Sequence, residues 1–506
     1  MSTLRTLLLI GSVLAAAQHA SAAQLSEADL ERAVIAAESP HYVIEDLPAP
    51  PSGEVLEVGC LQTLPGDRLA VGTRRGTILI AHHVSSPDPR QITWTVFARG
   101  LMEPLGMQWR DKEKALYVMQ KPEFTKLQDL DNDGAADHFE TITDRWGLNG
   151  NYHEFAFCAP PDADGSTWIT LCLTGSFTSD DRWRGWAMKI GADGSVTPAA
   201  SGIRSPGGMG KDADGNTYYT DNQGRWHGTS CLSLLTPGSF QGTFNGNRWY
   251  ADAPNMGPEP IAALPESRIE AERARIPQLV PPAILIPHGL VGQSPSGIIC
   301  DTTGALGPFK NQLFVAEQTF SQIQRVYIER INGVAQGMII PFKSGFSTGG
   351  IALQLLSNGM VYIGGTNRGW GARGGKSYDL QRMRYTGTAP FEIERINIAA
   401  DGFDVRFTAA VDPATAKLPA SYAMSAWSYI YHEGYGSPRV DQITPTITSA
   451  VPTADGLTVH LTVKGWHQGS VHQIDLPGVR SKKGAPLLHP TAYYTINEIP
   501  HAKSAN

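Results

Sequence analysis

The residues from Asp129 to Glu140 have the spacing of a loop that binds a divalent cation. They read DLDNDGAADHFE, with acidic side chains at loop positions 1, 3, 5, 9 and 12 and a glycine at position 6. A hard cation such as Ca²⁺ takes about six to eight oxygen ligands, and the glycine permits the sharp turn that gathers them. The alternative is a solvated acidic turn, in which the carboxylates would repel each other. The sequence therefore predicts a calcium site with the ligands Asp129, Asp131, Asp133, the Ala135 carbonyl, Asp137 and Glu140.

A second set of candidate residues lies in short, polar, glycine-containing phrases. His153 stands in NYHE, Arg204 in GIRSPGG, Asn222 in DNQG, and Arg368 and Arg373 in NRGWGAR. An imidazole has a pKa near working pH, so His153 suits a general base. Each phrase also has an ordinary explanation, because a lone histidine is more often structural and Asp-Asn is a good turn former. A functional role depends on whether the fold brings the phrases together. Two further phrases are His288-Gly289 and Ser294-Pro-Ser-Gly297.

The elements that would position these phrases are short strands that recur along the chain. A turn with Gly or Asp precedes each strand, and the strands are rich in β-branched and aromatic residues. Their spacing is about 50 residues, apart from one gap nearly twice as long, which is typical of β-propeller blades. The phrases above all fall at equivalent blade edges, so they would converge at one mouth of the channel. The strands are Arg68–Gly72, Lys114–Val118, Ser166–Thr170, Asn216–Thr220, Asn311–Val315 and Gly359–Ile363.

The long gap decides between six blades and seven. It contains a polar helical stretch, Pro265–Arg275, with no obvious blade content, so we read it as an insertion into a six-bladed propeller. A seventh blade would require Pro281–Pro287 to belong to a degenerate repeat. In the six-bladed arrangement the acidic loop falls between the second and third blades. We expect its calcium ion to hold the loop that carries His153 rather than to take part in chemistry.

After about residue 390 the pattern changes to strict alternation of apolar and polar residues, as in Phe403-x-Val405-x-Phe407. Such alternation indicates half-buried antiparallel strands, and about 110 residues of it suit an immunoglobulin-like β-sandwich. The fold class predicted is therefore all-β. The expected segments are a signal peptide (1–22), a helix and Pro-rich linker (23–52), the propeller (53–388) with loop 129–140 and a helical insertion at about 260–282, and the sandwich (389–500).

The order of the phrases resembles the soluble glucose and sorbosone dehydrogenases, which are six-bladed quinoprotein propellers. GLMEPLGM from Gly100, the histidine at 153, GIRSPGG from Gly202 and SPSG from Ser294 are similar to that family's phrases. DNQG, the acidic loop and the tail Ala492–Asn497 resemble more closely the "membrane-bound dehydrogenase-like" secreted proteins of planctomycetes and verrucomicrobia. This resemblance covers nearly the whole mature chain, although its individual motifs are short.

The resemblance implies an exported dehydrogenase that oxidises a sugar or a related alcohol or aldehyde. His153 would take the hydroxyl proton while hydride passes to pyrroloquinoline quinone, whose redox chemistry is its own. Arg204 would act in catalysis and cofactor binding, with Asn222, Arg368 and Arg373 as the other cofactor-binding residues. Because the chain has no haem motif, electrons would leave to a separate acceptor such as a periplasmic cytochrome c.

Two other functions remain open on the same scaffold, because a fold does not fix a function. One is a propeller that binds carbohydrate without redox chemistry. The other is a carbohydrate lyase or hydrolase, with His153 and Glu154 as an acid–base pair and Trp226 and Trp370 stacking on sugar. Three or more cations converging beside His153 would favour the quinone. An aromatic groove with paired carboxylates would favour a lyase or hydrolase.

Composition and the N-terminus restrict location and partners. Arg5, an apolar stretch Leu7–Ala17 and Ala20-Ser21-Ala22 have the pattern of a cleavable secretory signal, which predicts a periplasmic or secreted protein without a membrane span. A net charge of −7 in 506 residues, with scattered Lys and Arg, argues against nucleic acid as a partner. The expected partner is a carbohydrate or small polyol.

The five cysteines contain no C-x-x-C, which excludes the usual zinc and haem c motifs. In an oxidising compartment a disulfide between Cys158 and Cys172 is the first pairing to test. The alternative is that all five are buried as small apolar residues.

Overall fold

A computed structural model describes residues 26–501. The six strands that the sequence predicts are each the second strand of an antiparallel sheet, and they are almost completely buried. They are rich in apolar and aromatic residues because both faces are covered by neighbouring blades. The strands are β3 (Arg68–Thr73), β7 (Ala115–Met119), β11 (Thr167–Leu171), β15 (Thr217–Asp221), β20 (Leu313–Glu317) and β24 (Val361–Thr366).

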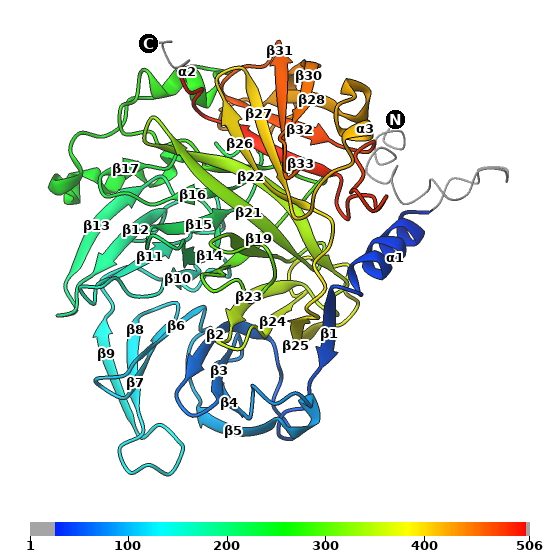
Figure 1. Ribbon diagram of the computed structural model, residues 1–506. Coiled ribbons are helices and arrows are strands. Elements are labelled where there is room, and N and C mark those ends of the chain that lie inside the picture. The colour runs from blue at the N-terminus through cyan, green and yellow to red at the C-terminus, as the bar shows by residue number, and fades with distance from the viewer. Residues whose placement is uncertain (1–25, 502–506) are drawn as a thin grey trace.

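The six innermost strands form a closed ring, in which each contacts the next and the last contacts the first. The ring establishes a six-bladed β-propeller and confirms the predicted fold class (Figure 1). Gly208 shows how closely the inner strands approach: a Cβ atom there would lie 2.7 Å from the backbone of Gly297 on the next blade. The ring consists of β2 (Val58–Leu64), β6 (Gly106–Arg110), β10 (Ala156–Cys158), β14 (Pro206–Lys211), β19 (Pro295–Cys300) and β23 (Gly350–Leu355).

The third and fourth strands complete the blades. The third strands are β4 (Ile78–His82), β8 (Phe124–Gln128), β12 (Trp186–Ile190), β16 (Ser230–Leu234), β21 (Gln322–Ile331) and β25 (Tyr378–Tyr385). The fourth are β5 (Thr93–Ala98), β9 (His138–Thr143), β13 (Val196–Ser201), β18 (Ile284–Ile286), β22 (Val334–Ser344) and β1 (Tyr42–Asp46). A short strand, β17 (Ser239–Phe240), pairs in parallel with β13. Because β1 precedes the propeller yet pairs with β25, the N-terminal strand closes the last blade.

The segment Pro281–Pro287 belongs to the fourth blade and not to a seventh. Its strand β18 pairs antiparallel with β16, with Ser230 opposite Ile286. The preceding connection holds one short helix, α2 (Ile269–Arg273), together with the 3₁₀ turns η3 (Phe244–Asp252) and η4 (Pro254–Met256). The long gap in the repeat is therefore a long connection between the third and fourth strands of one blade.

The last eight strands form two sheets around a shared core of buried apolar residues that includes Phe403, Val459 and Tyr494. One sheet has the order β26-β27-β31-β30, and the other is β33-β32-β28-β29. The immunoglobulin-like assignment stays a prediction that rests on this strand order. The strands are β26 (Ile393–Ala399), β27 (Gly402–Phe407), β28 (Ala423–Ser428), β29 (Val440–Ile443), β30 (Thr446–Pro452), β31 (Thr458–Lys464), β32 (Ser470–Asp475) and β33 (Thr491–Ile496).

The C-terminal strands and the propeller share one sheet. The strand β33 pairs with β22, so the fifth blade continues into the second sheet as eight hydrogen-bonded strands (Figure 1). The helix α1 (Glu27–Glu38) begins with a capping box of Ser26 and Asp29 and contacts β22. The short helix α3 (Pro413–Ala416) and the turns η2 (Pro89–Gln91) and η5 (Pro419–Ser421) complete the elements.

The five cysteines are free thiols. Cys158 lies opposite Ile169 in the β10–β11 pair, whereas the amide of Cys172 reaches the carbonyl of Phe155. The two cysteines are thus offset by three residues along the hairpin, and the predicted pairing of Cys158 with Cys172 is wrong. Within residues 26–501, no helix is both long and apolar enough to cross a membrane. The predicted signal peptide lies outside the described residues.

Candidate functional site

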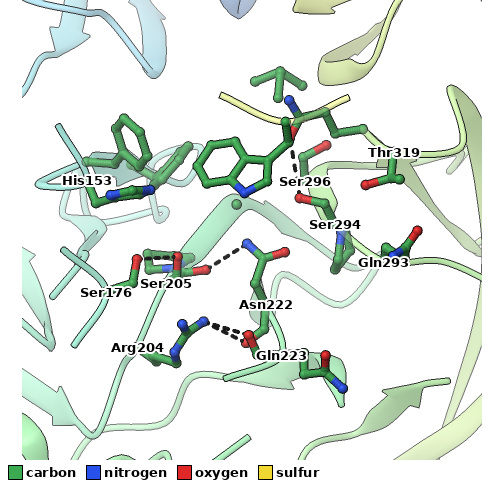
Figure 2. A pocket seen from close by; sticks show the side chains of 18 of the residues that line it. His153, Ser176, Arg204, Ser205, Asn222, Gln223, Gln293, Ser294, Ser296 and Thr319 are labelled. Atoms are coloured by element: carbon green, nitrogen blue, oxygen red, sulfur yellow. Dashed lines mark hydrogen bonds between the residues drawn. The ribbon is translucent and has the colours of Figure 1, made fainter. Parts of the chain in front are cut away.

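One mouth of the propeller channel opens into a cavity of about 360 Å³. It forms where the loops that enter the innermost strands meet the loops that leave the second strands, as the blade-edge argument predicts. Apolar and aromatic side chains alternate with neutral hydrogen-bonding groups along its wall, and no Asp or Glu is among the described residues that line it. The neutral polar residues are Ser176, Ser205, Asn222, Gln223, Gln293, Ser294, Ser296, Gln318 and Thr319, most of which are seen in Figure 2.

His153 lines this cavity from the loop between β9 and β10. Its backbone amide donates to Asn151 Oδ1 at 2.9 Å, and its half-buried ring lies 5.2 Å from that of Trp370, centroid to centroid. The pKa of His153 lies below its usual value, first because the ring is partly desolvated and then because Arg204, Lys121 and Arg74 place positive charge nearby. At neutral pH the ring is therefore an uncharged proton acceptor.

Arg204 lines the same side of the cavity as His153, while Gln293, Ser294 and Thr319 come from the opposite side (Figure 2). The residue is only 3% exposed, and its guanidinium donates to the carbonyls of Asn222 at 3.3 Å and Gln223 at 2.8 Å. Its Nε has no partner, and no carboxylate among residues 26–501 forms an ion pair with it. The phrase DNQG ends in glycine because a Cβ at Gly224 would lie 1.9 Å from Arg204 Cζ.

Two carboxylates that end second strands hold the loops that form the cavity. Asp221, at the end of β15, accepts from the amides of Arg204 at 2.9 Å and Ser205 at 2.7 Å. Glu317, at the equivalent end of β20, accepts from the amides of Gln293 and Ser294. Asp221 is therefore a loop support within DNQG. Glu317 was not predicted, although its place in the repeat, like that of Asp221, would have indicated it.

The other two predicted cofactor-binding arginines lie outside the cavity wall. Arg368 forms ion pairs with Glu57 at 2.6 Å and Glu103 at 3.2 Å. Arg373 pairs with Glu27 at 3.0 Å, and its guanidinium lies over the ring of Phe320. Arg368 and Arg373 therefore do not join Arg204 in the cavity wall, and carboxylates already pair with both.

Glu103 gathers three cations next to the cavity. Arg74, Lys121 and Arg368 all pair with this one carboxylate. Burial would raise the pKa of Glu103, but Arg74 and Lys121 outweigh it, and the pKa lies below its usual range. Lys121 also donates to the carbonyl of Tyr152 at 2.7 Å, which ties this cluster to the residue before His153.

The acid–base pair of His153 and Glu154 is not formed. Glu154 is fully buried, does not line the cavity, and accepts from the amide of Asn149 and the hydroxyl of Thr174, both at 2.9 Å. Trp226, predicted to stack on sugar, instead packs on Phe244 and Tyr431 and does not line the cavity. Trp370 does line the cavity and is 46% exposed.

Four aromatic residues of the cavity, Phe155, Phe157, Phe177 and Tyr435, were missed by sequence reasoning. Phe177 lies in the loop between β11 and β12, and Tyr435 lies in the loop between β28 and β29 of the C-terminal strands. Their rings lie on the guanidinium of Arg204, with centroid distances of 5.8 and 5.2 Å from Cζ. Nothing in the local sequence around Tyr435 indicates that it reaches the propeller, because the contact depends on how β33 joins β22.

The acidic loop brings Asp129, Asp131 and Asp137 together, with one carboxylate oxygen of each within 4.8 Å of the others. The loop connects β8 and β9, the third and fourth strands of the second blade, and so does not lie between blades as expected. Glu140 lies within β9 opposite Lys126, with which it pairs at 3.4 Å, and is not part of this cluster. The expectation that the loop holds His153 is wrong, because the β8–β9 and β9–β10 connections lie at opposite ends of the blade.

A tricarboxylate such as pyrroloquinoline quinone does not match the cations of this cavity. Several cations are needed to compensate three buried carboxylates. The charged side chains of the described wall are Arg204 and Arg74, and Arg74 already pairs with Glu103. Arg204, Lys121 and Arg74 do converge beside His153, but Glu103 compensates the last two, which leaves one uncompensated cation.

No protein-family model matches the chain, and no curated protein matches it. Similar solved structures include a glucose dehydrogenase of Thermus thermophilus, 16% identical, with a TM-score of 0.48 over 68% of this chain and 99% of that one. The PQQ-bound aldose sugar dehydrogenase of Streptomyces coelicolor is 14% identical, with a TM-score of 0.48 over 68% and 98%. The soluble aldose sugar dehydrogenase of Escherichia coli, in its apo form, is 11% identical, with a TM-score of 0.44 over 68% and 99%. At these identities and TM-scores the similarity assigns neither substrate nor cofactor to this chain.

Proposed function

We propose that this chain binds a carbohydrate or related polyol at the channel mouth and that His153 accepts a proton from one of its hydroxyl groups. The observation that carries the proposal is the cavity wall, in which an uncharged imidazole stands among amides, hydroxyls and an exposed indole. Amides and hydroxyls both donate and accept, which suits a ligand made of hydroxyl groups. Indole faces cover the apolar faces of sugar rings.

His153 is suited to proton transfer by its surroundings. The lowered pKa keeps the ring neutral, and Trp370 at 5.2 Å and Phe155 at 5.8 Å limit the positions that the imidazole can take. A positioned base of this kind contributes about 10²- to 10⁴-fold to a rate. Arg204 lies on the same wall, where its positive charge stabilises negative charge on a bound ligand.

Sugar oxidation is the first reaction to test, since the sequence phrases resemble those of sugar dehydrogenases. It needs an electron acceptor, and the cations of the cavity do not match the three carboxylates of pyrroloquinoline quinone. Carbohydrate binding without redox chemistry is the second candidate. The specific observation in its favour is the set of exposed aromatic side chains at the cavity, namely Phe177, Trp370 and Tyr435.

The test is reconstitution with pyrroloquinoline quinone and calcium, followed by dye reduction across a panel of sugars, beside glycan binding without the quinone. Dye reduction that His153→Ala removes, and that the distant control His82→Ala retains, supports oxidation. Glycan binding without dye reduction, weakened by Trp370→Ala, supports the non-redox function. A protein that neither binds nor turns over any sugar contradicts the proposal.

We also propose that Asp129, Asp131 and Asp137 bind calcium, with Asp133 and the Ala135 carbonyl as further oxygen ligands of the loop. Support comes from the converging carboxylates and from the bond of the Ala136 amide to the carbonyl of Phe97 on β5, at 2.7 Å. This bond links the loop to the first blade. A bound ion would therefore strengthen the contact between blades one and two, far from His153.

A further inference from the structure

The buried guanidinium of Arg204 forms no ion pair with any carboxylate in the part of the chain that the structure describes, and the nearby Asp221 accepts from the Arg204 backbone amide. Arg204 is 3% exposed, its only acceptors among residues 26–501 are the main-chain carbonyls of Asn222 and Gln223, and its Nε has no partner. Burial of a cation without a compensating charge is costly. Because Arg204 lines the cavity, an acidic group on the ligand is well placed to supply that charge.

The C-terminal strands add a wall to this part of the cavity. The loop between β28 and β29 is bonded to the propeller: the amide of Gly436 donates to the carbonyl of Gly224 at 3.0 Å, and that of Ser437 to Gly228 at 3.0 Å. In return the amide of Trp226 donates to the carbonyl of His432 at 2.9 Å. These bonds fix the ring of Tyr435, which is 63% exposed, beside Arg204.

The cavity therefore has two separate aromatic surfaces. Among residues 26–501, the ring contacts of Trp370 are with Tyr152 and His153, while Tyr435 contacts Phe177 at 6.2 Å. One surface lies beside the proposed base and the other beside the unpaired cation. The contacts of the described aromatic rings do not join the two surfaces, so each is available to a separate sugar unit.

We infer that the cavity takes an acidic carbohydrate of at least two sugar units. One unit lies at His153 and Trp370, and the other places its oxyanion on Arg204 and its ring against Tyr435. The oxyanion is the carboxylate of a uronic acid or a sulfate ester, since the N–H groups of a guanidinium donate to both. This inference rests on the proposed carbohydrate function and names its substrate class.

The test is equilibrium binding to a glycan array that pairs neutral, uronate-containing and sulfated mono-, di- and trisaccharides of otherwise matched structure. The wild-type chain is expected to prefer an acidic disaccharide or trisaccharide to its neutral counterpart and to the acidic monosaccharide. The uronate and sulfate arms show which oxyanion is used. Equal affinity for neutral and acidic glycans, or for acidic monosaccharides and disaccharides, overturns this inference. Either result still supports carbohydrate binding.

Variants separate the two parts of the site. Arg204→Gln should weaken acidic glycans about thirtyfold or more, because a buried charge pair is lost, and should change neutral ones little. Arg204→Lys should restore part of that loss. Tyr435→Ala, a substitution at an exposed side chain, should weaken disaccharides about three- to tenfold and monosaccharides little. The matched control is Tyr378→Ala, which is 41% exposed outside the cavity.

If Tyr435→Ala still prefers disaccharides to monosaccharides as strongly as the wild-type chain does, the C-terminal strands have no role in binding. If Arg204→Gln still prefers acidic to neutral glycans as strongly, Arg204 does not bind the acidic group. If the wild-type chain binds no glycan at all, both the inference and the proposed function are wrong.

Discussion

Two groups of buried charges in this molecule are arranged in opposite ways. At the junction of α1, β22 and the C-terminal strands, Glu38, Lys343, His489 and Glu392 pair with one another, at 3.1, 3.1 and 2.7 Å along the chain of contacts. At the channel mouth, Arg204 is equally buried and has no carboxylate partner among residues 26–501. Paired buried charges fix the parts of a fold relative to one another. Within the described residues, Arg184 and Arg325 are also buried without an ion pair, but only Arg204 among these three lines the cavity, where a ligand can reach it. Substitutions at the junction should therefore lower the free energy of unfolding, whereas substitutions at Arg204 should mainly weaken ligand binding.

The largest effect is expected for Glu38→Gln. The change leaves Lys343 buried without its carboxylate and removes one partner of His489, which should lower the free energy of unfolding by about 3–5 kcal/mol. Chemical denaturation followed by tryptophan fluorescence measures it. The control on the same helix is Glu27→Gln, whose exposed pair with Arg373 is worth about 1 kcal/mol or less. Equal, small losses in both variants would contradict the structural role of the junction.

The junction should also make stability depend on pH. Burial alone would lower the pKa of His489, but Glu392 and Glu38 outweigh it and raise the pKa to about 9. The ordinary value is 6.5, so the charged ring contributes fully below about pH 6.5, and the contribution is lost as the pH rises through about 9. Denaturation at pH 6.5 and 9.5 should differ by on the order of 3 kcal/mol. His489→Gln should flatten this dependence, and an unchanged slope would refute it.

The acidic loop is a third case, in which the carboxylates of Asp129, Asp131 and Asp137 converge at the surface. Calcium at about ten times its dissociation constant should raise the free energy of unfolding by about 1.4 kcal/mol. Calorimetry and thermal unfolding of the EDTA-treated chain measure binding and its effect. Asp129→Asn should abolish both, whereas Glu140→Gln should change neither because Glu140 pairs with Lys126. A loss of calcium affinity in Glu140→Gln would restore Glu140 as a ligand.

The smallest change in stability is expected at Arg204. Arg204→Gln removes a buried charge that forms no ion pair in the described chain, so the free energy of unfolding should change by about 1 kcal/mol or less, in either direction. Its glycan binding should nevertheless be the most affected. Denaturation under the conditions used for Glu38→Gln checks the contrast. A loss similar to that of Glu38→Gln would show that Arg204 is a structural residue.

The blades could be predicted from sequence because the second strand of each is buried on both faces and follows a turn with Gly or Asp. The fourth strands could not, since β1 and β18 pair with partners that no local pattern specifies. For the same reason the sequence left open a seventh blade that would include Pro281–Pro287.

The site residues also differ in whether local sequence could predict them. His153, Arg204 and Asn222 were found because blade edges converge whatever the details of the loops. The positions of Arg368 and Arg373 outside the cavity wall could not be predicted, because sequence does not show which carboxylate neutralises a cation. Tyr435 was missed because its place depends on the long-range pairing of β33 with β22.

The most direct test of the central claim is a crystal structure of the chain with the tightest-binding acidic disaccharide from the array. We predict that the oxyanion lies within hydrogen-bond distance of the Arg204 guanidinium and that a hydroxyl group faces the imidazole of His153. The two sugar rings should lie on Trp370 and Tyr435. A sugar bound with its acidic group away from Arg204, or bound outside this cavity, would contradict it.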